Sequence, residues 1–88
     1  MSVKEYVSRM EEACGEGRDF IILLRPDKRE QAIQRILEKC EEERSLSGVM
    51  TKMKYKDRKL SVFVTGKIIM KDLTGKEEAE TLLEELLT

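Results

Sequence analysis

Acidic side chains are the residues of this chain whose type and spacing most suggest a ligand. The 88 residues include 18 Asp and Glu, and many of these fall in two short segments. The candidate metal ligands are Glu11, Glu12, Glu16, Asp19, Glu41, Glu42 and Glu43. Calcium accepts roughly 6–8 oxygen ligands in flexible geometry, which carboxylates and loop carbonyls supply. The pattern predicts a site for a divalent cation, with calcium as the best match.

The same acidic segments also have a simpler interpretation. The EF-hand pattern of alternating Asp residues followed by Gly and a distant Glu is absent. Runs such as Glu41–Glu43 are also typical of a helix surface that only contacts water. A solvated acidic surface without a ligand is therefore the alternative.

Basic residues gather in a different part of the chain. The stretch Val49–Lys71 holds seven Lys and Arg against one acid, in a protein whose formal net charge is −1. The candidate nucleic-acid residues are Lys52, Lys54, Lys56, Phe63 and Lys67. A single strand binds such a face by stacking bases on an aromatic ring and placing phosphates against ammonium groups. Lysines on a bare sheet also discourage aggregation, so a solvated face is the alternative.

Catalytic groups are sparse. The chain has no His, and neither Cys14 nor Cys40 has a neighbouring His or Lys cluster that would activate a thiolate. The two Thr-Gly-Lys triplets, at Thr65 and Thr74, lack the spacing of a phosphate-binding P-loop. The sequence predicts a binding protein rather than an enzyme. It also predicts two reduced thiols, with a disulfide between them as the alternative.

Three segments have helical periodicity together with a start signal. They begin at Ser2, at Asp27 and at Thr74, and their apolar residues recur at three- and four-residue spacing. Strand patterns fill the gaps at residues 20–24, 49–56, 60–65 and 68–73. The sequence predicts one α+β domain over residues 1–88, with a two-layer architecture. A four-stranded, mainly antiparallel sheet carries the helices on one face, in the order α-β-α-β-β-β-α.

This predicted topology brings the acidic residues together. Each helix returns along a strand, so all three helices end at the same end of the domain. The carboxylates of Glu11, Glu12 and Glu41–Glu43 then lie in last helical turns, where the helix dipole disfavours negative charge. We expect a cation to offset that cost at this acidic pole.

The last third of the chain resembles a known family. Ser61-Val62-Phe63-Val64-Thr65-Gly66-Lys67-Ile68-Ile69 and Thr74-Gly75-Lys76-Glu77-Glu78-Ala79-Glu80 resemble one repeat of the archaeal TATA-binding protein family, over about residues 60–88. The resemblance implies a curved antiparallel sheet backed by helices. That family binds the DNA minor groove with two repeats, Asn residues and paired Phe residues. This chain has length for one repeat, no Asn, and Phe63 alone on such a face, which argues against sequence-specific DNA recognition.

The composition also predicts the habitat and the cellular location of the protein. Charged residues make up 40% of the chain and thermolabile amides are few, which is typical of thermophilic proteins. The chain has no secretory pattern and no apolar run of about 20 residues, so we expect a cytoplasmic protein without a membrane partner. A protein partner that supplies a basic patch or the second half of the sheet is a third hypothesis, after the cation and the nucleic acid.

Overall fold

The computed structural model describes residues 3–13, 18–46 and 48–87. A short 3-10 helix, η1 (Val3–Glu5), precedes the first strand. The elements that follow are β1 (Val7–Glu12), β2 (Phe20–Leu24), α1 (Arg29–Lys39), β3 (Glu41–Leu46), β4 (Met50–Tyr55), β5 (Arg58–Phe63), β6 (Lys67–Lys71) and α2 (Lys76–Leu87).

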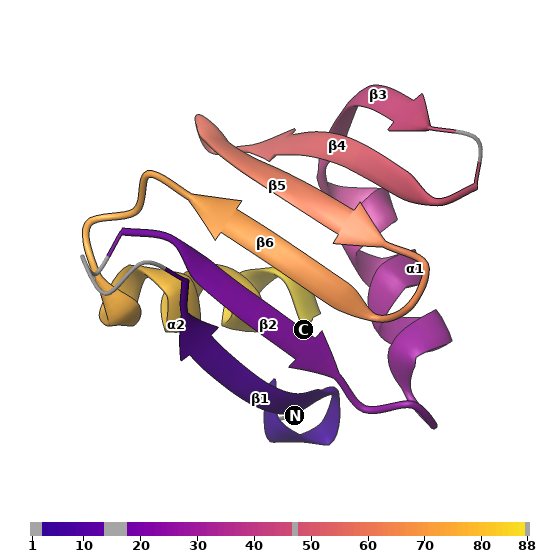
Figure 1. Cartoon of the computed structure of the whole chain (residues 1–88), viewed down its shortest axis with the longest axis horizontal. Coiled ribbons are helices and arrows are strands. Elements are labelled where there is room, and N and C mark those ends of the chain that lie inside the picture. Colours follow the sequence, from indigo (N-terminus) through magenta and orange to yellow (C-terminus); the bar gives the residue numbers. More distant parts are fainter. Residues whose placement is uncertain (1–2, 14–17, 47, 88) are drawn as a thin grey trace.

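The strands form a single six-stranded sheet in the order β1-β2-β6-β5-β4-β3, with every neighbouring pair antiparallel. Helices α1 and α2 lie on the same face of this sheet, so the domain has two layers (Figure 1). Strands β1 and β3 are its two edges. The other face of the sheet is left without a covering element among the described residues.

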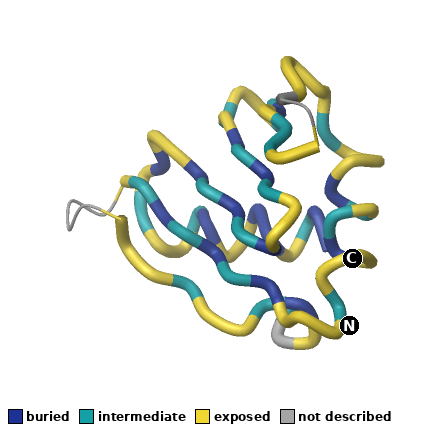
Figure 2. The backbone as a smooth tube through the Cα atoms, turned by 45° about the vertical axis from the view of Figure 1, so that its right-hand side comes forward, coloured by how far each residue is buried: buried dark blue, intermediate teal, exposed yellow. Residues whose placement is uncertain are grey.

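The hydrophobic core lies between the sheet and the two helices. Alternate residues of the inner strands point into it, and Figure 2 shows their regular change between buried and partly exposed positions. The core residues of the inner strands are Phe20, Ile22, Leu24, Met53, Leu60, Val62, Ile68 and Met70. Helix α1 adds Ala32 and Ile36, and α2 adds Ala79, Leu82, Leu83, Leu86 and Leu87.

The predicted four-stranded sheet with three helices is wrong, because two acidic segments are edge strands. Residues 7–12 form β1 rather than a helix. A β-bulge at Ser8 explains the error: Val7 pairs with Leu24 and Met10 pairs with Ile22, so both face the core although they are three residues apart. A bulge adds one residue to the two-residue period of a strand. The resulting spacing of three imitates a helix.

The second error concerns the end of α1. The sequence predicts a helix that continues through Glu41–Glu43, but α1 ends at Lys39 and Cys40 is already extended. A basic residue in the last turn is favourable for the helix dipole, whereas three carboxylates there would be unfavourable. The chain avoids that cost because residues 41–46 pair with β4 as an edge strand. The helices at residues 29–39 and 76–87 lie within their predicted segments.

One carboxylate connects the helical layer to the hairpin of β4 and β5. Glu85 of α2 accepts a hydrogen bond from the Tyr55 hydroxyl at 2.9 Å and forms an ion pair with Lys56 at 2.7 Å. The Lys39 ammonium donates to the Glu85 carbonyl at 2.6 Å. The hydrogen bonds from Lys56 and Tyr55 lower the pKa of the Glu85 carboxyl. The C-terminal ends of both helices are thereby joined to one strand end.

Removing the side chain of Ile68 tests the position of the core. Ile68 is 0% exposed on the central strand β6, so Ile68→Ala should lower the free energy of unfolding by about 2–5 kcal/mol. The matched control is Val64→Ala, because Val64 is 54% exposed and should change stability by less than about 0.5 kcal/mol. Urea unfolding followed by circular dichroism measures both. Equal effects of the two substitutions would contradict the burial pattern.

The Glu85 contact should make stability depend on pH. A carboxyl whose pKa is lowered by folding stabilises the protein above its unfolded pKa, about 4.3, and loses that contribution as the pH falls through the folded value. The midpoint of thermal unfolding should therefore fall in Glu85→Gln at pH 7, and the difference should be smaller at pH 3, because protonation of this carboxyl removes its contribution. Glu80→Gln, on an exposed position of α2, is the control. A difference that is the same at both pH values would contradict this role.

Candidate functional site: the open face of the sheet

The acidic candidate ligands are not brought together. Glu11 and Glu12 lie on β1 and Glu41–Glu43 on β3, at opposite edges of the sheet. Five gaps of roughly 4.8 Å between strands separate these edges by about 24 Å. Glu11 forms an ion pair with Arg9 at 3.0 Å, and Asp19 accepts a hydrogen bond from the Asp72 backbone N–H at 3.1 Å. Glu16 is outside the described residues.

The predicted acidic pole depended on three helices that finish at the same end of the domain. Residues 7–12 and 41–46 are strands instead, so that arrangement is absent from the described residues. Across residues 3–13, 18–46 and 48–87, no group of three or more His, Cys, Asp or Glu is arranged to hold a metal ion. The divalent-cation site stays a prediction, without the geometry on which it was based.

The basic residues are brought together on the face of the sheet that lies away from the helices, here called the open face. Register and alternation place side chains of the four inner strands on it. These are Ile21, Leu23, Met50, Lys52, Lys54, Lys59, Ser61, Phe63, Lys67, Ile69 and Lys71. The set contains five lysines and no carboxylate, in a protein of net charge −1. The edge strands add charges of both signs to this face: Arg9 and Glu11 on β1, and Glu41 and Arg44 on β3. The open face therefore concentrates positive charge.

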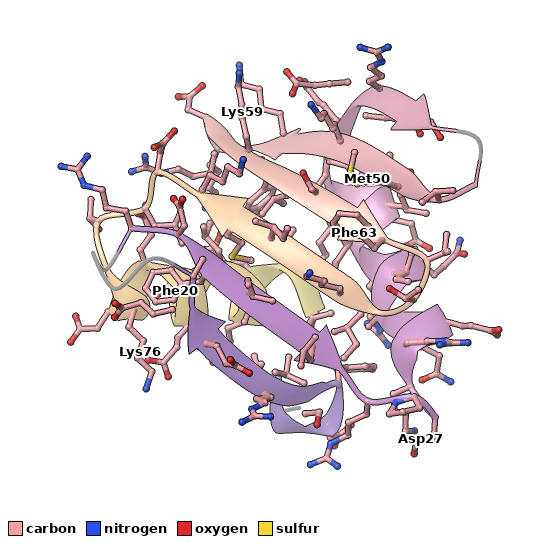
Figure 3. All side chains as sticks on the ribbon, in the orientation of Figure 1. Phe20, Asp27, Met50, Lys59, Phe63 and Lys76 are labelled. Atoms are coloured by element: carbon pink, nitrogen blue, oxygen red, sulfur yellow. The ribbon has the colours of Figure 1, made fainter. Side chains whose placement is uncertain are left out.

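Apolar side chains from all four inner strands lie on the open face. Ile21 pairs with Ile69 across β2 and β6, and Phe63 pairs with Met50 across β5 and β4. All four side chains are partly exposed. Figure 3 shows Phe63 and Met50 as neighbours on the near side of the sheet. The Lys67 ammonium lies 5.8 Å from the centre of the Phe63 ring, so one face of the ring is within reach of a cation.

Three lysines form a row across the inner strands. Lys54 pairs with Lys59, and Lys59 pairs with Lys71, in the registers of β4, β5 and β6. Like charges directly opposite one another destabilise a sheet. Lys54 lies 3.7 Å from the almost fully exposed Asp57, whereas Lys59 and Lys71 form no ion pair with any described residue. The fold thus holds positive charges close together and leaves Lys59 and Lys71 available to an anion, while Glu41 lies opposite Lys54 at the β3 end of the row.

Lys56 does not belong to this surface, contrary to the sequence-based prediction. Lys56 and Asp57 have φ values of 49° and 64°, and they form the two-residue turn between β4 and β5. Positive φ at both positions is the geometry that suits a tight hairpin. The turn directs the Lys56 ammonium to Glu85 of α2, on the helical side of the sheet.

The sequence-based candidates Lys52, Lys54, Phe63 and Lys67 do lie on the open face. Lys59 and the apolar residues Ile21, Leu23, Met50 and Ile69 were missed as members of the site. Alternation along residues 58–63 carries the signal for Lys59, because Leu60 and Val62 occupy the opposite face. The lysine row needs the register as well.

Cys40 follows the last residue of α1 and is a free thiol. Partial burial raises its pKa to about 11, so the thiolate that would be reactive is scarce at neutral pH. Cys14, the other residue of the predicted thiol pair, is outside the described residues. Cys40 has the properties of a packing residue and not of a nucleophile.

Comparisons of the chain with protein-family models, with curated proteins and with solved structures found no match. The resemblance of residues 60–88 to the TATA-binding protein family stays a prediction. No helix in the described part of the chain has the length and apolar character needed to span a membrane.

The raised pKa of Cys40 predicts a slow thiol. In a Cys14→Ser variant, where Cys40 is the remaining cysteine, about one thiol in a thousand is ionised at pH 8 when the pKa is about 11. Reaction with a chromogenic disulfide reagent should be at least about a hundredfold slower than for an ordinary thiol. The same variant in concentrated urea is the control and should react at the ordinary rate. A fast reaction of the folded protein would contradict the burial of Cys40.

Proposed function

We propose that this protein is a non-enzymatic binding protein that binds single-stranded nucleic acid on its open face, without base-sequence specificity. The observation that supports the proposal is the composition of the four inner strands on that face: five lysines, no carboxylate and a partly exposed Phe63. A single strand presents phosphates and unstacked bases together. Ammonium groups attract the phosphates, and aromatic or apolar side chains support the bases.

The geometry favours a single strand over a duplex. Side chains on the face of a sheet project only a short distance, whereas base edges in a duplex are read by an element that enters a groove. A splayed single strand exposes its bases to such a surface. Lysine ammonium groups recognise phosphate as point charges and carry no base code, so binding should tolerate any sequence.

Nucleic acid also explains this face better than a protein partner does. Protein interfaces are enriched in Tyr, Trp and Arg and depleted in Lys. The open-face side chains of the four inner strands include five Lys and no Arg, Tyr or Trp. A polyanion is the ligand that relieves the repulsion in the row of Lys54, Lys59 and Lys71. The cation hypothesis has weaker support, since its candidate ligands on β1 and on β3 lie at opposite edges of the sheet.

Fluorescence anisotropy with a labelled oligothymidylate of about 12 nucleotides tests the proposal. Phe63→Ala should weaken binding roughly 5- to 150-fold, because stacking of one base contributes about 1–3 kcal/mol. The matched control is Val64→Ala, the adjacent exposed residue outside the paired strands. Affinity should also fall with salt, with a slope of about −0.7 for each phosphate neutralised.

Substitutions of the lysines provide a second, independent test by the same anisotropy measurement. Lys59→Gln with Lys71→Gln should make the salt slope less steep by about 1.4, because two phosphate contacts are lost. Lys28→Gln with Lys76→Gln removes the same charge from residues outside the open face and should leave the slope unchanged. Binding that ignores Phe63 and responds equally to both lysine pairs would overturn the proposal. An acidic polypeptide that binds the face while oligonucleotides do not would make it a protein-docking surface.

A further inference from the structure

A hollow of about 180 Å³ opens on the basic side of the open face. It is lined by Glu43, Lys52, Lys59, Leu60, Ser61 and Lys71. Ser61 is central in it, because it pairs with Lys52 on β4, while Lys59 and Lys71 form the next cross-strand pair. Three strands thus direct ammonium groups to the surroundings of a single hydroxyl.

The polar groups of the hollow lack partners within the described part of the chain. Lys52, Lys59 and Lys71 form no ion pair there, and the Ser61 hydroxyl forms no hydrogen bond. Ammonium groups donate up to three hydrogen bonds each, and a hydroxyl donates one. A compact anion with several oxygen atoms matches such a set of donors, and phosphate is the anion that nucleic acid supplies.

The hollow and the aromatic ring lie in a fixed relation to each other. Ser61 and Phe63 are two residues apart on β5 and point to the same side, at a separation of roughly 6.6 Å. One nucleotide unit can reach from a base over Phe63 to a phosphate over Ser61. Lys59 continues the same line along β5.

We propose that this hollow is a phosphate subsite, which takes one phosphate group next to the base that stacks on Phe63. The inference rests on the proposed function and deepens it, since it gives the bound strand a direction along β5. Lys52, Lys59 and Lys71 donate to the phosphate oxygens, and the Ser61 hydroxyl donates from the floor of the hollow.

Glu43 is the acidic member of the hollow. It is the bulged residue of β3, between Glu42, which pairs with Met53, and Arg44, which pairs with Lys52. Its carboxylate opposes an incoming phosphate and weakens the subsite. The bulge turns the side chain of this edge residue toward the inner strands, and it thereby places a negative charge beside the proposed phosphate.

Amide NMR shifts of the labelled protein, titrated with inorganic phosphate at low salt, test the subsite. Saturable shifts should be confined to the surroundings of Lys52, Lys59, Ser61 and Lys71. Lys59→Gln with Lys71→Gln should weaken phosphate binding about tenfold, because charge-assisted hydrogen bonds are lost. Lys54→Gln with Lys67→Gln removes the same charge from the same face but outside the hollow, and should have a much smaller effect.

Glu43→Gln supplies a gain of affinity, which a variant that merely unfolds cannot produce. Removing one negative charge from the lining of the hollow should strengthen phosphate binding about threefold. Equal weakening by the two lysine pairs, together with no effect of Glu43→Gln, would mean diffuse attraction by the whole face and would overturn the subsite.

A parallel titration with an oligothymidylate separates this inference from the proposed function. If the oligonucleotide shifts the amides near both Phe63 and Ser61, both stand. If it shifts those near Phe63 and leaves Ser61 unaffected, the function stands and the subsite is overturned. If inorganic phosphate binds in the hollow while the oligonucleotide does not bind, the subsite stands for another phosphate-bearing ligand and the proposed function fails.

Discussion

The sheet buries only one of its two faces, and the rest of this structure depends on that constraint. Two helices cover one face of a six-stranded sheet, and every large fully buried side chain lies between these layers. Among the described residues, no helix or strand covers the opposite face. The inner strands must therefore combine a hydrophobic face with a face that tolerates water. The alternation of Leu60 and Val62 with Lys59 and Ser61 on β5 meets both demands.

The same constraint explains where the acidic residues lie. An antiparallel sheet with two free edges is at risk of pairing with other chains, and charged side chains and bulges reduce that risk. Both edges here have them: β1 has a bulge at Ser8, and β3 has one at Glu43 within its acidic run. The carboxylates thus flank a lysine-rich centre. A polyanion is repelled at the two edges and attracted to the middle strands, which favours a path along β5 over one across the sheet.

The sequence predicts the parts of this fold in which periodicity is regular. Strand β5 and helix α2 follow from their patterns, since each buries one face of an uninterrupted element. Strand β1 does not, because the bulge gives Val7 and Met10 a helical spacing. Strand β3 has no alternation to detect, and its extended state comes from pairing with β4.

The site follows the same rule: the candidates on residues 52, 54, 63 and 67 needed alternation alone, whereas the row of Lys54, Lys59 and Lys71 needed the register. Lys56 was misplaced because a turn reverses the direction of its side chain.

Stability and the proposed binding depend on different faces of the same strands. The core face of β5 and β6 holds the domain together, while the open face adds repulsion between lysines and leaves Phe63 and Ile69 partly exposed. Such a surface is unfavourable in the free protein, and the core offsets its cost. A ligand that binds only the folded state stabilises that state by mass action and so offsets the cost. An anion that neutralises the lysines reduces the repulsion between them, and a base that covers Phe63 reduces its exposed apolar surface. These are two separate parts of the cost. A ligand that carries both groups in one molecule relieves it most completely, and a nucleic-acid single strand has that combination in every repeating unit.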